Sequence, residues 1–240
     1  MMKNKSLWKG LIVMLAAAFV MLAVPVQKVS AAETKLKWGS TYSGSINVSK
    51  CYKYAFSLKQ SGNVTFVFQV SDAGYAFTSM DEITVLDETG KEVYRIDNVG
   101  DCSLSLDLLA GNYTLRIGME DGMDGCNFTF TPSFKSSKET KSERAMAKNN
   151  EMGTATSYKI GKSVKGQLAL NDDIDIYKMR VTKSQYLNLT VSSKLRELNI
   201  NLVNTSGSRN VSISDIEAGL HKYRVFFYQR VHIMSSSEVV

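Results

Sequence analysis

The sequence predicts an all-β protein: two tandem antiparallel β-sandwich modules, jelly-roll-like, after a signal peptide. Apolar and polar residues alternate with a period of two through most of the chain after residue 32, as in 63–68 (NVTFVF) and 104–108 (LSLDL), which is the pattern of half-buried strands. There are only two prolines, and Gly or Asn turns separate the strand candidates. The same ordered landmarks occur twice, at a spacing of about 110–120 residues that is typical of domains rather than of solenoid units.

The first element, residues 1–31, is expected to be a secretory signal peptide. Three lysines precede an apolar run from Leu11 to Val24, and small residues at 29–32 (VSAA) suit cleavage. The alternative is an uncleaved anchor, but the run is shorter than the ~20 residues that a spanning helix needs. No later stretch is long and apolar enough to cross a membrane. We therefore expect a secreted or extracellular protein, with no transmembrane segment after cleavage.

The charge of the chain comes largely from this first segment. The full sequence has 29 basic and 23 acidic residues. Removal of 1–31 takes away four lysines and no acidic residue, which leaves 25 against 23. A nearly balanced mature chain gives little support for nucleic-acid binding.

The first module is expected to span residues 32–135 and the second residues 156–240. Their strand candidates occur in the same order, at 54–56, 64–68, 83–86 and 113–117 in the first, and at 177–179, 187–191, 200–203 and 223–226 in the second. Residues 136–155 are rich in Lys, Glu, Ser and Asn and are predicted to be a polar linker. Within it, 143–148 (ERAMAK) could form a short helix.

Turn chemistry explains several landmarks without any catalytic role. The steps at 87–90 (DETG) and 204–207 (NTSG) suit hairpin turns with a residue at positive φ. In Ala110–Tyr113 (AGNY), the glycine permits a bend and the tyrosine hydroxyl is expected to bond back to it, as in a tyrosine corner. Ala218-Gly219 with Tyr223 is interpreted as the counterpart in the second module.

The end of the second module is atypical. The first module has a closing strand candidate at 127–130 (NFTF), whereas 229–240 (QRVHIMSSSEVV) has no matching segment. An incomplete C-terminal strand would leave the second sandwich with an unpaired edge and reduce its stability.

All three cysteines, Cys51, Cys102 and Cys126, fall in the first module. Either one disulfide forms or the cysteines are small apolar residues within strands. A cysteine nucleophile would need a base nearby, and the two histidines, His221 and His232, lie at the far end of the chain.

The order of the landmarks in the second module resembles the bacterial pre-peptidase C-terminal domain family. The shared features are Gly166-x-Leu168, Asp173-x-Asp175-x-Tyr177, a strand ending in Asn204-x-x-Gly207, and Ala218-Gly219 before a tyrosine strand. The first module shows the same order more weakly. The family includes the collagen-binding domains of clostridial collagenases, so the resemblance implies a β-sandwich that binds an extracellular protein or polysaccharide.

The resemblance also implies a calcium site. In those relatives a Glu-x-Glu-Pro-Asn-Asn linker and an Asp-x-Asp pair bind calcium, and Asn149, Asn150, Asp173 and Asp175 match parts of that set. Crowded carboxylates such as 171–175 (NDDID) repel unless a cation joins them, and calcium takes six to eight oxygen ligands.

The match is incomplete. Ala145 and Ala147 occupy the positions of the two glutamates and Lys148 that of the proline, although Glu143 or Glu151 could substitute. A hydrogen-bonded turn is therefore the alternative to a calcium site. In the first module Lys50 and Tyr52 take the aspartate positions, and no equivalent site is expected there.

A second acidic loop, 120–125 (EDGMDG), does not have the EF-hand spacing and is interpreted as a polar hairpin. Aromatic residues offer candidate contact surfaces for sugars or peptides, although core packing explains most aromatics in a sandwich. These candidates lie at expected strand ends or loops of the first module: Trp38, Tyr42, Tyr75, Phe77 and Tyr94.

The sequence contains no metalloprotease, serine-hydrolase, phosphate-loop or Cys-x-x-Cys motif, and its paired aspartates lie on one turn rather than across a cleft. We therefore expect a protein that is not an enzyme. The favoured interpretation is an exported binding module for an extracellular protein or glycan, released or associated with the cell surface. The alternative is a structural spacer or accessory fragment of a larger secreted hydrolase.

Overall fold

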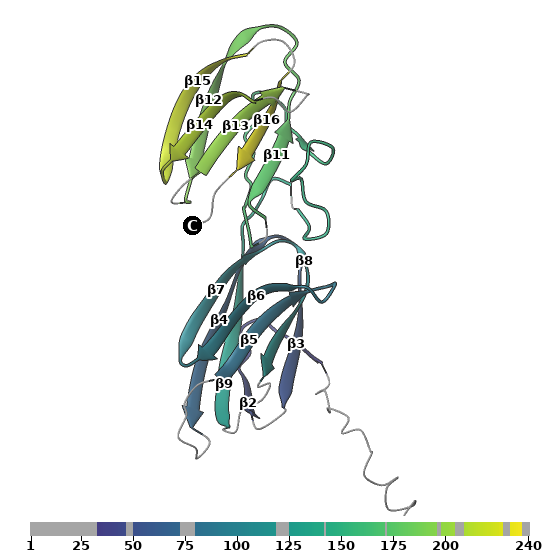
Figure 1. The fold of residues 1–240 in the computed structure, drawn as a ribbon, viewed down its shortest axis with the longest axis vertical. Helices are drawn as coiled ribbons and strands as arrows, with labels where there is room; N and C mark the ends of the chain where they lie inside the picture. The colour runs from purple at the N-terminus through teal and green to yellow at the C-terminus, as the bar shows by residue number, and fades with distance from the viewer. Residues whose placement is uncertain are drawn as a thin grey trace, which may run out of the picture. The chain divides into compact units, whose positions relative to one another are not determined.

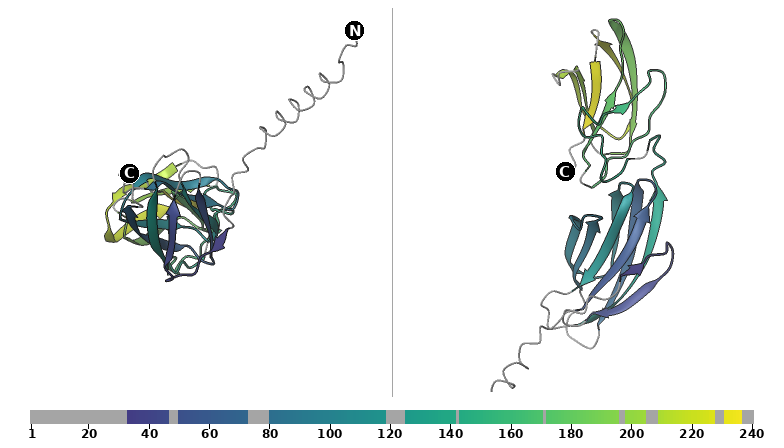
Figure 2. Two further views of the ribbon diagram at one scale, coloured as in Figure 1. Left: turned by 90° about the horizontal axis from the view of Figure 1, so that it is seen from below. Right: turned by 90° about the vertical axis from the view of Figure 1, so that its right-hand side faces the viewer.

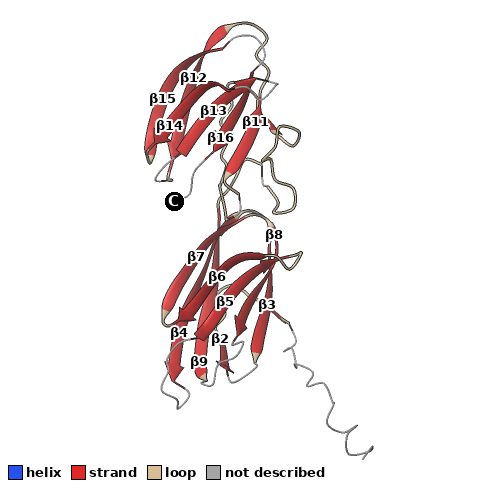
Figure 3. Cartoon of the chain, viewed as in Figure 1, coloured by secondary structure: helices blue, strands red, loops and turns tan. Residues whose placement is uncertain are grey.

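The computed structural model describes residues 33–46, 50–72, 80–118, 125–141, 143–170, 172–195, 198–204, 209–227 and 231–236. The expected signal peptide, the acidic loop and the second of the two hairpin turns lie outside this part of the chain. Every regular element that is described is a strand, as Figures 1 and 3 show. No helix among the described residues is long and apolar enough to span a membrane.

The first module has two sheets. One has the strand order β1-β3-β8-β5-β6 and the other β2-β9-β4-β7. The strands are β1 (Thr34–Lys35), β2 (Tyr42–Ile46), β3 (Cys51–Leu58), β4 (Gly62–Asp72), β5 (Met80–Asp87), β6 (Glu92–Val99), β7 (Cys102–Leu108), β8 (Gly111–Gly118) and β9 (Cys126–Ser136). All described pairs within these sheets are antiparallel except β1 with β3.

The two sheets lie face to face (Figure 2), and their inward faces pack on each other through aromatic rings. Tyr54 of β3 meets Phe130 of β9 at 4.9 Å between ring centroids, and Phe56 of β3 meets Phe66 of β4 at 5.8 Å. Both contacts are edge-to-face, the arrangement that aromatic quadrupoles favour. The residues between them along each strand face outward, so the period of two in the sequence produces the core.

In its described residues, the second module repeats this plan with fewer strands. One sheet has the order β10-β11-β16-β13-β14 and the other pairs β12 with β15. The strands are β10 (Thr156–Ser157), β11 (Ile174–Lys178), β12 (Gln185–Ser193), β13 (Leu198–Asn204), β14 (Arg209–Ile216), β15 (Gly219–Phe227) and β16 (Val231–Ser236). Its core centres on five buried side chains: Met179, Val181, Ile200, Leu202 and Ile216. The prediction of an all-β protein with sandwich modules is confirmed.

The strand orders align the two modules differently from the sequence landmarks. Because β10-β11-β16-β13-β14 matches β1-β3-β8-β5-β6, β16 is the counterpart of β8 and β15 the counterpart of β7. The interpretation of Ala218-Gly219 and Tyr223 as the counterpart of Ala110–Tyr113 is therefore wrong. The expected unpaired edge is present, since β12 pairs only with β15 among the described residues, whereas β4 lies between β7 and β9.

The linker is ordered by contacts rather than by a helix. The expected helix at 143–148 is instead a turn closed by the Ala147 N–H, which donates to the Arg144 carbonyl at 2.8 Å. The Ala145 N–H donates to Ala110 O at 3.0 Å, and the Ala110 N–H donates to Glu143 O at 3.3 Å. Farther along, Asn149 O accepts from the Ile176 N–H at 3.0 Å.

Two local predictions in the first module are confirmed. Gly90 has a φ of 80°, and Asp87 Oδ1 accepts the Thr89 N–H at 2.9 Å and the Lys91 N–H at 3.0 Å, which closes the hairpin turn. The Tyr113 hydroxyl donates to Leu109 O at 3.0 Å, as in a tyrosine corner.

The role expected of Gly111 is wrong. A Cβ at this position would approach nothing closer than 3.4 Å, and the residue does not have a positive φ. The three cysteines lie in β3, β7 and β9 and form no disulfide. Cys126 is buried, as the second interpretation expects, whereas Cys51 and Cys102 are only half-buried.

Candidate metal centre

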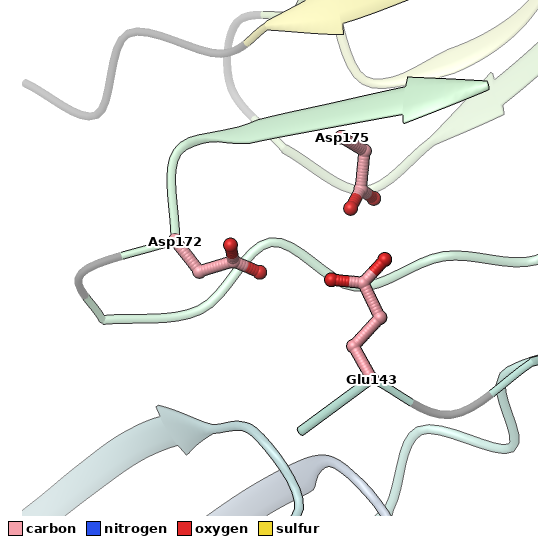
Figure 4. Close-up of side chains that lie close together, drawn as sticks. All are labelled: Glu143, Asp172 and Asp175. Carbon is pink, nitrogen blue, oxygen red and sulfur yellow. The ribbon is translucent and has the colours of Figure 1, made fainter. Parts of the chain in front are cut away.

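Three carboxylates from separate parts of the chain converge at the start of the second module. Glu143 comes from the linker, Asp172 from the turn before β11, and Asp175 from β11 itself. Their nearest carboxylate oxygens lie within 4.8 Å of one another. Figure 4 shows the side chains of Asp172 and Asp175 directed toward the carboxylate of Glu143.

Backbone hydrogen bonds fix the direction of Asp172. The Asp172 N–H donates to Ala169 O at 2.9 Å, and the Ala169 N–H donates back to Asp172 O at 3.0 Å. This closed turn leaves the side chain of Asp172 fully buried, with an exposed fraction of 0%. The Asn150 side chain lies near enough to lower the pKa of Asp172, but no hydrogen bond of normal length and angle reaches either carboxylate oxygen of Asp172 or Oε2 of Glu143. Buried carboxylates normally have such partners, so these oxygens are candidates to bind a cation.

Two linker amides border the cluster. The Asn149 side chain is 3% exposed; its Nδ2 donates to Thr156 Oγ1 at 3.4 Å, while its Oδ1 is buried without a donor. Asn150 Oδ1 is also buried without a donor. The donor set thus combines carboxylate and amide oxygens, which are ligands that calcium prefers.

A glycine makes room for one ligand. A Cβ on Gly166 would lie 2.8 Å from Asp175 Oδ2 and 2.6 Å from the Tyr177 hydroxyl oxygen. That hydroxyl donates to Asp175 Oδ2 at 3.3 Å and orients the carboxylate. A larger residue at 166 would displace both groups.

The cluster resists ionisation. Burial, together with the negative charges of Asp175 and Asp172, raises the pKa of Glu143 to about 8. Burial raises the pKa of Asp175 to about 6, and the charge of Asp172 adds to this effect. Burial also raises the pKa of Asp172. A cation among these oxygens would reverse each shift, because it stabilises the charged carboxylates.

The cost of leaving the cluster without a cation can be gauged from distance. Two unit charges 4.8 Å apart repel by about 3.5 kcal/mol at an effective dielectric constant of about 20. A divalent cation would replace this repulsion with attraction to each oxygen. An all-oxygen set favours a hard cation, and a set of protein oxygens suits calcium better than magnesium, which demands regular octahedral geometry and usually keeps several waters.

Only some of the site residues predicted from the sequence lie at the carboxylate cluster. Asp175, Asn149 and Asn150 lie at or beside the cluster, whereas Asp173 is exposed and takes no part in it. Asp172 occupies the place expected of Asp173, because it is held in a turn where strand alternation does not apply. Glu143 supplies the linker carboxylate, while Glu151 is exposed. Asn171 lies outside the described residues.

In the first module the equivalent position carries a different side chain. The pairings of β1 with β3 and of β10 with β11 align Tyr54 with Tyr177, and hence Tyr52 with Asp175. The Tyr52 hydroxyl bonds to the backbone of Ser45, accepting from N at 3.1 Å and donating to O at 2.9 Å.

The candidate contact aromatics lie mainly in packing positions. Trp38 is 39% exposed but contacts the rings of Phe56 and Phe134 at 5.8 and 5.6 Å. Tyr42 stacks on Phe130 at 5.2 Å. Tyr94 is half-buried against the core, and Tyr75 and Phe77 lie outside the described residues.

Comparison with known proteins leaves the family open. No family model and no curated protein matches this chain. Among solved structures, the chain is similar to the CUB1-EGF-CUB2 domains of rat MASP-1, with a TM-score of 0.29 and 8% identity over 86% of this chain and 95% of that chain. It is also similar to Bacteroides uniformis beta-glucuronidase, with a TM-score of 0.22 and 12% identity over 78% of this chain and 21% of that chain. At such TM-scores neither likeness bears on function.

Proposed function

We propose that this chain is an exported, non-catalytic binding protein whose second module is stabilised by a calcium ion held between Glu143, Asp172 and Asp175. One observation carries the calcium part: three carboxylates from separate parts of the chain, one of them fully buried, converge within 4.8 Å of one another without a cationic side chain among them in the described residues. Asn149 and Asn150 would complete the oxygen set. The ion would bind ligands from the linker and from the module at once.

Export and membership of the pre-peptidase C-terminal domain family belong to the same proposal. The basic and apolar pattern of residues 1–31 supports export. The order of landmarks that includes Asp175 and Tyr177 supports the family. An extracellular protein or glycan is the corresponding partner class. Extracellular fluids also supply the calcium concentrations at which modules of modest affinity are occupied.

Calorimetric titration of residues 32–240 with calcium, and separately with magnesium, tests the metal site. We expect one calcium site with a dissociation constant below about 10⁻³ M, the weak limit for extracellular modules, and weaker binding of magnesium. Asp172→Asn should abolish the signal, and Asp173→Asn should preserve it. Equal calcium binding by both variants would contradict the assignment.

The partner class is tested by a binding panel of collagen, mucin, peptidoglycan and soluble glycans, with calcium and with a chelator. Binding that disappears on chelation would support a calcium-dependent adhesive module. Failure against every ligand by correctly folded protein would favour the spacer interpretation, whatever the result for calcium.

A further inference from the structure

Strand β12 of the second module has hydrogen-bonded neighbours on one side only. All nine residues from Gln185 to Ser193 pair antiparallel with β15, from Phe227 back to Gly219. The described part of the chain places no strand on the opposite edge. A long strand with an open edge is a template for pairing with another chain.

The first module shows what fills this place. Its strand β4 pairs with β7 on one side and, from Gly62 to Asp72, with β9 on the other. Strand β9 contributes Phe128 and Phe130, each 1% exposed, to the core. It also pairs with β2, so a single strand closes two edges at once.

Two features of the second module indicate that its described residues include no counterpart of β9. The inward side chains Leu187, Leu189 and Val191 are only half-buried, whereas Val64, Phe66 and Phe68 at the corresponding place in β4 are at most 1% exposed. A Cβ on Gly44 in β2 would lie 2.8 Å from the Tyr52 ring, as one on Gly166 would lie 2.8 Å from Asp175, the residue aligned with Tyr52. Gly166 is therefore the counterpart of Gly44, yet residues 163–168 form no strand. Both differences are expected if one strand is missing between these segments.

Among the described residues of the second module, no strand other than β15 pairs with β12. The segments 158–170 and 179–184, which are described, form no strand.

The charges near the open edge of β12 indicate which kind of segment would bind there. Neither residues 181–195 nor β15 contains an aspartate or glutamate. Exposed cations lie at both ends of β12, at Lys183 and Lys194, and on β15, at Lys222 and Arg224. A strand that approaches this edge would be attracted if its outward residues were acidic.

We infer that the open edge of β12 binds an extended segment of another protein, with large apolar side chains at alternate positions and acidic residues between them. Backbone hydrogen bonds would supply affinity and the alternating side chains specificity, as in β-strand addition. The inward residues of the segment would cover Leu187, Leu189 and Val191. This inference is independent of the calcium proposal.

Two synthetic peptides test the inference on the mature chain, residues 32–240. The first has the sequence of residues 127–136 (NFTFTPSFKS), and the second has glutamate in place of the outward Thr129 and Thr131. Hydrogen exchange followed by mass spectrometry should show that either peptide slows exchange of β12 by about tenfold or more at saturation. The acidic peptide should bind more tightly, and added salt should weaken its binding.

The matched controls separate the alternatives. A peptide of the same composition without the alternation should leave exchange in β12 unchanged. The double variant Lys183→Glu with Lys194→Glu, at exposed positions, should remove the advantage of the acidic peptide. No protection by either alternating peptide would overturn the inference. Protection of β12 without peptide, rising with protein concentration alongside dimer formation, would also overturn it, because a second copy would then be the occupant. Equal binding of both alternating peptides would overturn the acidic part.

Discussion

Replacing Asp172 with asparagine should change stability in opposite directions with and without calcium. The substitution nearly preserves size and removes a charge from the Glu143, Asp172 and Asp175 cluster. Asp173→Asn is a matched control, because it makes the same chemical change one residue away, at an exposed position. Both variants lower the negative charge of the chain by one, so a difference between them reports the site alone.

The magnitude follows from the geometry. Without calcium, a fully charged pair at 4.8 Å repels by about 3.5 kcal/mol at an effective dielectric constant of about 20. Protonation of Glu143, whose pKa is about 8, and partly of Asp175, whose pKa is about 6, relieves some of this repulsion near neutrality. We expect Asp172→Asn to stabilise the calcium-free module by about 1–2 kcal/mol, a rise of roughly 5–15 °C in its melting temperature.

Calcium should reverse this order. At a free concentration about 100-fold above its dissociation constant, calcium stabilises the unsubstituted protein by about 2.7 kcal/mol. Asp172→Asn should gain little of that increment, whereas Asp173→Asn should gain all of it. Calorimetric melting of residues 32–240 in calcium and in chelator measures both quantities. A loss of stability in Asp172→Asn that is the same in both conditions would refute the reasoning, since it would make Asp172 a purely structural residue.

Three further predictions concern pH, local stability and the tyrosine corner. The pKa of Glu143 is raised to about 8, above the unfolded value of about 4.3, so the calcium-free folded protein binds more protons than the unfolded chain between these values. The free energy of unfolding should fall as pH rises through that window, and urea unfolding at several pH values measures this fall. The fall should be shallower when calcium is present and in the Glu143→Gln variant. An unchanged dependence on pH in both cases would contradict the raised pKa of Glu143. Hydrogen exchange should be faster in the second module than in the first, because the inward side chains of β12 are only half-buried; equal protection would mean that the open edge costs little. Tyr113→Phe removes a buried hydrogen bond of 3.0 Å and should lower the free energy of unfolding by about 1–2 kcal/mol. Tyr42→Phe removes a hydroxyl that accepts from an exposed backbone N–H and should lower it by less than about 0.5 kcal/mol. Thermal melting compares the two variants.

The strands could be predicted from sequence, but their pairing in the second module could not. Alternation with a period of two is a local property, and it located the strands that contain 64–68, 83–86 and 187–191. Pairing depends on contacts far apart in sequence. The short pattern Ala-Gly before a tyrosine fits both Gly111–Gly118 and Gly219–Phe227, yet the first strand pairs with β3 and β5 and the second with β12. Three matching residues carry too little information to choose between these neighbours.

Only part of the candidate metal site could be predicted from the sequence, because the direction of a side chain outside a strand does not follow from periodicity. Asp173 and Asp175 are two residues apart and would share a face of a continuous strand. However, β11 begins at Ile174, and the turn before it directs Asp172 inward and leaves Asp173 exposed. Side-chain direction in a turn depends on its backbone dihedrals, which no periodic pattern encodes. Glu143 could be named only as a possible substitute, because its position depends on backbone contacts with the first module.

The backbone contacts of Glu143 with the first module have a further consequence. Its backbone carbonyl accepts hydrogen bonds from the Ala110 N–H at 3.3 Å and from Ser61 Oγ at 3.4 Å in the first module, while its carboxylate faces Asp172 and Asp175. If calcium binds at this cluster, the first module raises the effective concentration of one ligand for it. Linkage then requires reciprocity: the factor by which a folded first module tightens calcium binding is the factor by which calcium favours the folded first module. Glu143 would in this way couple the two modules, in addition to the direct contact in which the Leu170 N–H of the second module donates to Asp107 O of the first at 2.9 Å.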